Sequence, residues 1–77
     1  MTPLSQVWMR GDAPGGFRWR RRRIEIKRVI EGWREAGKWW RGDPEIAVWR
    51  VEGSDHGVYE LAFDSEGKRW WLARIYD

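Results

Sequence analysis

The C-terminal half of the chain alternates in hydropathy with a period of two residues, and this pattern constrains the fold most. Residues 46–52, 58–64 and 69–76 each read as a β-strand, because alternate residues of a strand face opposite sides of a sheet. The intervening residues 53–57 and 64–68 contain Gly, Ser and Asp, which is typical of turns. This half therefore predicts a three-stranded antiparallel meander.

The last of these strands carries large apolar side chains on both faces. We expect Trp70, Leu72 and Tyr76 to alternate with Trp71, Ala73 and Ile75. A flat, one-sided sheet would leave one of these faces in water, whereas a curled sheet or a sheet covered by a helix buries both. No cysteine is present among the 77 residues, so neither a disulfide nor a thiolate zinc site supports the core. Eight tryptophans supply buried area instead, since aromatic rings bury about 150–250 Å² each.

Shorter patterns fill the N-terminal part. Residues 1–16 read as an N-terminal segment, with an edge strand at residues 7–9 and a Gly/Pro turn at residues 11–16. Residues 17–20 alternate aromatic and basic side chains and residues 24–27 alternate again, which predicts a hairpin with its bend at Arg21-Arg22-Arg23. That bend lacks the Gly or Asn that favours a tight turn.

Residues 26–40 combine two patterns. Apolar residues and glycine recur at the three- and four-residue spacing of an amphipathic helix, at Ile26, Val29, Ile30, Trp33, Gly37 and Trp40. Gly32 opposes a helix, because glycine costs about 1 kcal/mol relative to alanine there. We predict strand to about Val29, followed by one to three helical turns before Gly37.

The predicted fold is mainly β. It consists of a single small antiparallel sheet or a curled, barrel-like roll of about five strands, with one short helical segment. Residues 17–77 form a single β-rich domain that follows the N-terminal segment.

The residues needed for catalysis are largely missing. Ser54, Asp55 and His56 are consecutive in a loop, so their side chains cannot form a catalytic relay. The aspartates match no calcium-loop spacing, and no glycine-rich nucleotide-binding motif is present. We therefore predict a chain that is not an enzyme and needs no metal or cofactor. No apolar run approaches the roughly 20 residues of a membrane span, and no secretory leader precedes the domain, so we expect no membrane partner and a cytoplasmic location.

Charge is unevenly distributed along the chain. Residues 1–38 carry ten Lys or Arg against four Asp or Glu, whereas residues 39–77 carry five against eight, so that a half of charge +6 precedes a half of charge −3. Such asymmetry predicts a surface built for a polyanion. The candidate phosphate contacts are Arg18, Arg20, Arg21, Arg22, Arg23, Lys27 and Arg28. Arginine binds phosphate through a planar fork and stacks on bases. A plain solvated surface and an acidic protein partner are the alternatives.

Aromatic residues beside arginines extend this prediction. Trp19 lies within the basic segment, where it would stack on a base or support the arginines. Trp39 and Arg41 form a second candidate for stacking or for partner binding. Trp8 is a further candidate anchor for a protein partner.

Several segments together resemble a small uncharacterised bacterial domain that occurs alone or attached to proteins like the Y-family, translesion DNA polymerases. The resemblance covers about residues 17–77 and rests on Phe17-Arg18-Trp19, Trp33-Arg34-Glu35-Ala36-Gly37-Lys38-Trp39-Trp40, Trp49-Arg50-Val51, Val58-Tyr59-Glu60-Leu61 and Trp71-Leu72-Ala73-Arg74-Ile75-Tyr76-Asp77. It implies a DNA-repair context and brings no catalytic residues. The chain departs from it at Arg21, where we expect a glycine.

Two functions remain open at this point. The first is a non-enzymatic accessory module that binds nucleic acid, as single-stranded or primer–template DNA, through the basic hairpin. The second is a protein-interaction module that docks on a polymerase-like partner through an exposed aromatic groove. The sequence leaves the oligomeric state open.

Overall fold

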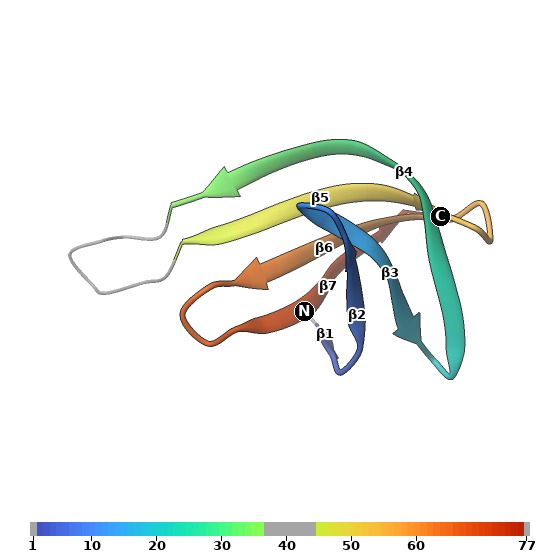
Figure 1. Cartoon of the computed structure of the whole chain (residues 1–77), viewed down its shortest axis with the longest axis horizontal. Helices are drawn as coiled ribbons and strands as arrows, with labels where there is room; N and C mark the ends of the chain where they lie inside the picture. Colours follow the sequence, from blue (N-terminus) through green and yellow to red (C-terminus); the bar gives the residue numbers. More distant parts are fainter. Residues whose placement is uncertain (1, 37–44, 77) are drawn as a thin grey trace.

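The strands form one antiparallel sheet with the order β1-β7-β6-β5-β4-β3-β2. This computed structural model describes residues 2–36 and 45–76. The strands are β1 (Thr2–Leu4), β2 (Val7–Arg10), β3 (Ala13–Trp19), β4 (Arg22–Glu35), β5 (Ile46–Gly53), β6 (Val58–Asp64) and β7 (Arg69–Tyr76). The sheet curls into a half-barrel (Figure 1). The prediction of a mainly β, curled antiparallel fold is therefore confirmed.

The predicted number of strands and the predicted helix are wrong. The described residues form seven strands instead of about five, and they contain no helix. The meander of β5, β6 and β7 is confirmed, with antiparallel registers that include Val51↔Tyr59 and Leu61↔Leu72. The N-terminal segment contributes two strands, β1 and β2, of which only β2 was predicted.

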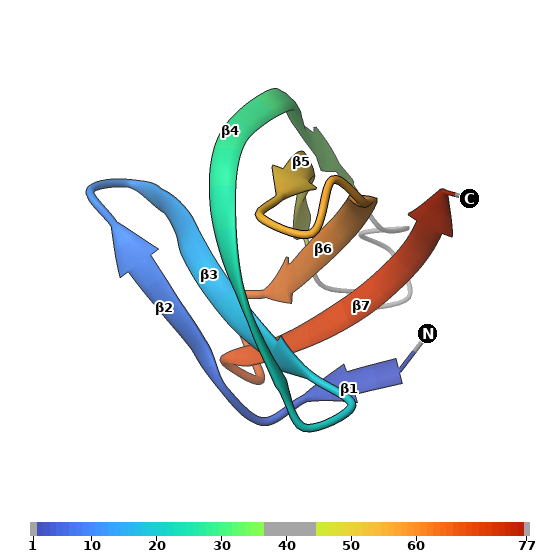
Figure 2. The same ribbon diagram turned by 90° about the vertical axis from the view of Figure 1, so that its right-hand side faces the viewer.

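The curl of the sheet follows from the connection between β1 and β2. These strands lie at opposite edges of the sheet, yet only residues 5–6 separate them in the chain. The two edges must therefore lie close together at this corner, which Figure 2 shows from one end of the sheet. The Arg18 backbone N–H donates a hydrogen bond to the Gln6 carbonyl at 3.0 Å and holds the link against β3.

Two bulges in β4 explain part of the resemblance of its sequence to a helix. The register with β5 shifts between Ile26 and Arg28 and again between Val29 and Glu31. Each bulge inserts one extra residue, so residues on the core side recur at intervals of three, at Ile26, Val29 and Gly32. The spacing of three between Ile26 and Val29 resembles that of a helix, but Ile30 is itself a bulge residue and Trp33 pairs with Val48 on the opposite face. The strand continues to Glu35. Gly37, at the end of the predicted helix, lies outside the described residues.

A bulge in β7 places Ile75 and Tyr76 on the faces opposite to those predicted. Glu60 lies opposite Arg74 whereas the adjacent Leu61 lies opposite Leu72, which leaves Ala73 as the extra residue. Beyond it the faces exchange, so Ile75 follows Leu72 toward the core and Tyr76 joins Trp71 on the other face.

The concave face of the sheet holds the hydrophobic core. Its buried members are Leu4, Phe17, Ile24, Ile26, Val51, Tyr59, Leu61 and Leu72. Burying one such large side chain contributes roughly 1.5–3 kcal/mol. Phe17 and Tyr59 meet edge to face, with their ring centroids 5.1 Å apart. This contact joins β3 to β6 across the half-barrel.

Polar and aromatic side chains cover the convex face together. Glu60 is only 8% exposed, and Arg50 lies 2.9 Å from its carboxylate. The Tyr76 hydroxyl donates a hydrogen bond to the same carboxylate. The Arg50 guanidinium also lies 5.2 Å from the Trp33 ring centroid and 5.4 Å from that of Tyr76. The buried charge is thus paired, which buried carboxylates require.

The N-terminal residues take part in the sheet. The predicted edge strand at residues 7–9 is confirmed as β2, but the Gly/Pro turn is limited to Gly11 and Asp12. β3 begins at Ala13 and crosses the boundary that was predicted between residues 16 and 17. Gly16 is required there, because a Cβ atom would lie 2.3 Å from the Trp8 ring. The Trp8 indole therefore lies directly on the β3 backbone.

Candidate nucleic-acid interface

The β3–β4 turn is formed by Arg20 and Arg21 alone. Trp19 pairs with Arg22, and the two arginines between them have positive φ angles of 50° and 64°. The predicted bend at Arg21-Arg22-Arg23 is therefore corrected, because Arg22 and Arg23 already belong to β4. A two-residue hairpin turn of this kind normally uses Asn-Gly, since L side chains are disfavoured at positive φ.

Three of the seven predicted phosphate contacts are held in ion pairs. The pairs are Arg22–Asp55 at 2.8 Å, Arg23–Glu25 at 3.0 Å and Arg28–Glu52 at 2.7 Å. The hydrogen bond from Arg23 lowers the pKa of Glu25, and that from Arg28 lowers the pKa of Glu52. Exposed pairs contribute only about 0–1 kcal/mol, so a phosphate can compete with these carboxylates. Their charge is nonetheless partly neutralised in the free protein.

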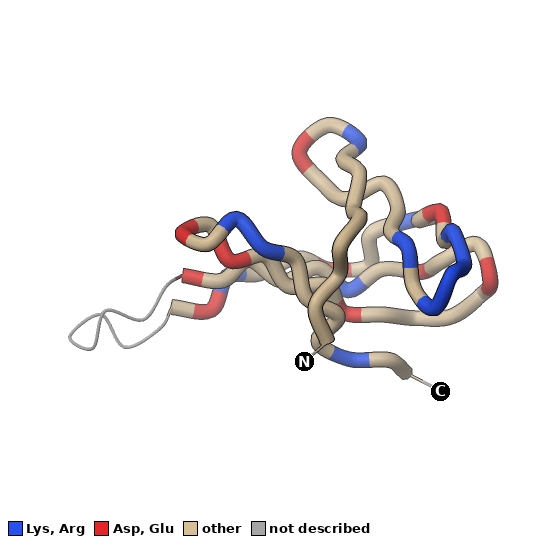
Figure 3. The backbone as a smooth tube through the Cα atoms, turned by 90° about the horizontal axis from the view of Figure 1, so that it is seen from below, with Lys and Arg blue, Asp and Glu red and all other residues tan. Residues whose placement is uncertain are grey.

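The other four predicted contacts are Arg18, Arg20, Arg21 and Lys27. All four are exposed, and none has a carboxylate oxygen within 4.0 Å in residues 2–36 and 45–76. Arg18 also lies directly opposite Arg23, and like charges in such cross-strand positions are destabilising. Figure 3 shows the resulting basic stretch at the β3–β4 turn. The hairpin end therefore carries positive charge that an anion would neutralise.

Trp19 lies on the concave side of this hairpin and is half-buried. The Arg20 guanidinium is 5.1 Å from the Trp19 ring centroid, which is a cation–π contact. A hollow of about 450 Å³ beside the indole is lined by Trp19, Arg20, Arg22, Tyr59 and Ile75. A second hollow of about 310 Å³ shares Trp19, Arg20 and Ile75 and adds Thr2, Leu72, Ala73 and Arg74. We call the two together the Trp19 groove.

Asp55 fixes one wall of the Trp19 groove. Its carboxylate accepts hydrogen bonds from the Tyr59 hydroxyl, the Gly57 N–H and the Arg22 guanidinium. Burial alone would raise the pKa of Asp55, but the hydrogen bonds outweigh it and hold the pKa below its usual value. Burial, followed by the contact with Asp55, raises the pKa of Tyr59 to about 12. This cluster ties the β5–β6 loop to the basic hairpin.

Sequence reasoning predicted only part of this site. It placed Trp19 with the arginines, but it missed Tyr59 and Ile75, which reach the groove from β6 and β7. The sequence offers one signal for the groove, because Ile75 is an apolar residue in a strand with apolar side chains on both faces. In the structure, Ile75 is 41% exposed.

Two other predicted aromatic sites have different outcomes. Trp39 and Arg41 lie outside the described residues. Trp8 lies apart from the Trp19 groove. Its ring is covered by the guanidinium of Arg23, 4.3 Å from the ring centroid.

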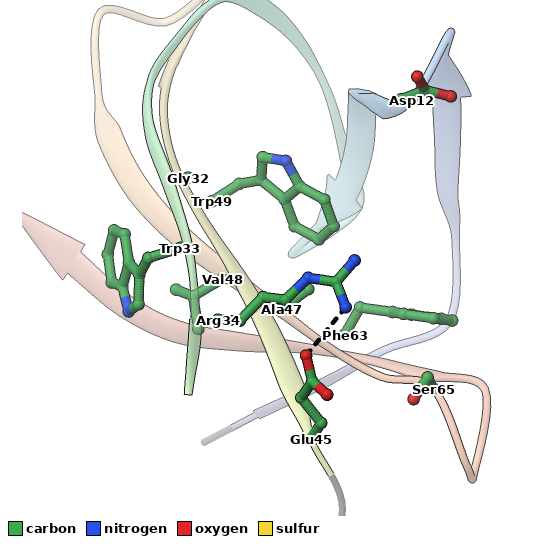
Figure 4. Close-up of a pocket in the computed structure, with 10 residues that line it drawn as sticks. All are labelled: Asp12, Gly32, Trp33, Arg34, Glu45, Ala47, Val48, Trp49, Phe63 and Ser65. Carbon is green, nitrogen blue, oxygen red and sulfur yellow. Dashed lines mark hydrogen bonds and ion pairs between the residues drawn. The ribbon is translucent and has the colours of Figure 1, made fainter. Parts of the chain in front are cut away.

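A separate hollow of about 530 Å³ lies on the concave face beyond Trp49 (Figure 4). Ala47, Trp49 and Phe63 supply apolar surface, and the Arg34–Glu45 ion pair, with N and O 2.9 Å apart, lies at one side. Trp33 points away from it, on the opposite side of β4. The hollow is therefore amphipathic and lacks the excess of arginine found at the hairpin.

A protein-family match covers most of the residues described above. Residues 5–77 match the Domain of unknown function (DUF6504). The chain belongs to the DUF6504 family. The DUF6504 match begins just before β2, so it contains the basic hairpin and most of the Trp19 groove. This confirms the expectation of a small uncharacterised domain. No curated protein and no solved structure matches the chain.

Two further observations concern other kinds of site. In the residues that the structure describes, no three His, Asp or Glu side chains are grouped so that they could hold a metal ion. The same residues contain no helix with the length and hydropathy of a membrane span.

Proposed function

We propose that this domain is a non-enzymatic module that binds nucleic acid through its β3–β4 hairpin. Arg18, Arg20 and Arg21 contact phosphates directly, and Trp19 supports them from the concave side. Arg22, Arg23, Lys27 and Arg28 add to the positive surface, and Arg23 and Arg28 do so by exchanging a carboxylate for a phosphate.

One observation carries this proposal. Arg20 and Arg21 occupy consecutive positive-φ positions, where Asn-Gly would be more stable, and no described carboxylate neutralises them. Backbone strain of this kind is frequent at binding sites, where the surrounding structure maintains it. Charged residues at these strained positions bring no advantage to a surface that only contacts water, whereas they favour the binding of a polyanion.

The resemblance to domains attached to Y-family polymerases supports a more specific context. We propose that the ligand is single-stranded or primer–template DNA, and that the domain acts in DNA repair or lesion bypass beside a polymerase-like protein. The basic hairpin would then hold the template backbone while the partner performs the chemistry.

The test compares two variants that lose the same charge at different turns. Arg20→Asn with Arg21→Gly removes two positive charges from the β3–β4 turn. Lys68→Gly with Arg69→Gln removes one from the β6–β7 turn, where Lys68 also has a positive φ of 52°, and one from the first residue of β7. Binding of a labelled single-stranded oligonucleotide is measured by fluorescence anisotropy.

We expect the β3–β4 variant to bind at least about tenfold more weakly, because two charge-assisted contacts are lost. The β6–β7 variant should retain affinity close to that of the original chain. Equal losses of affinity in both variants would show that binding depends only on net charge, and this would refute a site at the hairpin. Absence of binding by the original chain at low salt would refute the function.

The hollow beside Trp49 favours a second function. Its aromatic floor and its ion pair would suit a short peptide, which fits a protein-interaction module that docks on a polymerase-like partner. In that function the hairpin variant would leave partner binding unchanged, and Trp49→Ala, checked for folding by thermal denaturation, would weaken it.

A further inference from the structure

The Trp19 groove combines an apolar slot with a cationic rim. Ile75 is 41% exposed although it lies opposite the buried Tyr59 on the core side of the sheet. An exposed isoleucine beside a half-buried indole leaves apolar surface in contact with water. Arg20 and Arg22 line the same hollow. A ligand that fills the slot would therefore have an apolar flat part next to a negative charge.

We infer that the Trp19 groove accepts one unpaired base of a single strand, while Arg20 and Arg21 hold the flanking phosphates. This inference rests on the proposed function and specifies its ligand as single-stranded. The base inserts between the Trp19 indole and the Ile75 side chain. The volume of about 450 Å³ lies within the range of about 300–1,000 Å³ that is typical of small-ligand sites.

Geometry excludes a base that remains in a duplex. The groove opens on the concave side of the hairpin, whereas paired bases are stacked inside a helix whose outer surface is phosphate. A single strand presents bases and phosphates on the same stretch of chain, which matches an indole and two arginines on one turn. Contact with a duplex would use the arginines and leave the groove empty.

The wall of the groove is fixed before a ligand binds. The Asp55 carboxylate holds Arg22 and the Tyr59 hydroxyl in place, so the slot does not have to form during binding. A preformed slot avoids the entropy cost of ordering side chains on association. The arginines at the tip, in contrast, have no described carboxylate to leave when a phosphate arrives.

The experiment uses three probes of equal length: a thymidine oligonucleotide, the same backbone with every base replaced by an abasic spacer, and a duplex. We expect the abasic strand to bind at least about fivefold more weakly than the thymidine strand, although it carries the same phosphates. The duplex contacts the arginines alone, so its affinity should not change in a variant that alters only the groove.

Two matched variants locate the effect. Ile75→Ser removes the apolar wall of the groove, and Met9→Ser removes an apolar side chain of similar exposure, 49%, from β2. Ile75→Ser should lower affinity for the thymidine strand and leave affinity for the abasic strand unchanged, whereas Met9→Ser should change neither. Because the comparison of thymidine and abasic strands uses the original chain, it does not depend on the folding of a variant.

The outcomes separate this inference from the proposed function. Equal affinity for the thymidine and abasic strands would overturn the base site and leave the phosphate contacts intact. Equal effects of Ile75→Ser and Met9→Ser would likewise overturn it. Absence of binding to all three probes would overturn the proposed function and the inference with it.

Discussion

Arg20 and Arg21 hold a backbone conformation that is costly for any L residue except glycine and, to a lesser degree, asparagine. Their φ angles of 50° and 64° fall in the left-handed region, at both central positions of a two-residue hairpin turn. The sequence indicated the difficulty, since the segment lacks Asn or Gly and departs from the resembling domains at Arg21. The structure shows that the turn forms nonetheless.

The double replacement Arg20→Asn with Arg21→Gly should therefore stabilise the fold. Asn-Gly is the preferred pair for this turn, and removal of the left-handed strain is worth about 1 kcal/mol or more. For a domain of this size the melting temperature should rise by roughly 4–8 °C for each kcal/mol. A thermal denaturation curve followed by circular dichroism measures this change.

The same variant should bind oligonucleotide more weakly, so stability and binding would change in opposite directions. An unchanged or lower melting temperature would show that the arginines are not strained at this turn. The argument for a binding role would then lose its main support.

The Asp55 carboxylate joins the β5–β6 loop to the basic hairpin, beside the hydrogen bonds between Ser54 and Glu25. It accepts hydrogen bonds from Arg22, Tyr59 and the Gly57 N–H, and its pKa lies below the usual value in the folded chain. A lowered folded-state pKa contributes stability that is present above the unfolded pKa of about 4 and is lost as the pH falls through the folded value.

Asp55→Asn should therefore lower the free energy of unfolding at pH 7 by about 1–3 kcal/mol. The difference from the original chain should shrink as the pH falls below about 4, because Asp55 of the original chain then binds a proton in the unfolded state and, at still lower pH, in the folded state too. Urea denaturation at a series of pH values measures both effects. Asp12→Asn, at an exposed turn, is the control and should stay within about 0.5 kcal/mol of the original chain. A deficit for Asp55→Asn that is constant with pH would contradict this account.

At the scale of elements, the sequence predicted strands well where alternation is regular and failed where bulges interrupt it. β6 and β7 have the predicted bounds. β4 does not, because the extra residues at Lys27 and Ile30 convert a period of two into intervals of three. The bulge at Ala73 reverses the predicted faces of Ile75 and Tyr76 for the same reason. Bulges leave no compositional mark in these strands, so periodicity alone cannot detect them.

At the scale of the whole molecule, contacts between residues that are distant in the sequence determine the features that could not be predicted. The pairing of β1 with β7 closes the half-barrel at one corner and brings the C-terminal strand beside the hairpin. The basic residues of the candidate site were predictable because they are contiguous. The partners of Arg22 and Arg28 were not, because Asp55 and Glu52 lie at least 24 residues away in the chain.

The distribution of charge over the fold also becomes clear only in three dimensions. Most of the acidic residues that pair with the basic segment come from β5 and from the β5–β6 loop. These acidic residues partly neutralise Arg22 and Arg28, and the arginines of the turn stay positively charged. Arg18, Arg20 and Arg21 thus place three positive charges without a described carboxylate partner at the end of the hairpin.

The most direct test of the account is the salt dependence of binding to a single-stranded oligonucleotide. The logarithm of the association constant should fall linearly with the logarithm of salt concentration, by about 0.7 for each phosphate neutralised. Arg20→Asn with Arg21→Gly should reduce that slope by about 1.4, and Lys68→Gly with Arg69→Gln should leave it unchanged. Binding that does not depend on salt, or a slope that the hairpin variant leaves unaltered, would contradict the claim that the β3–β4 hairpin binds phosphates.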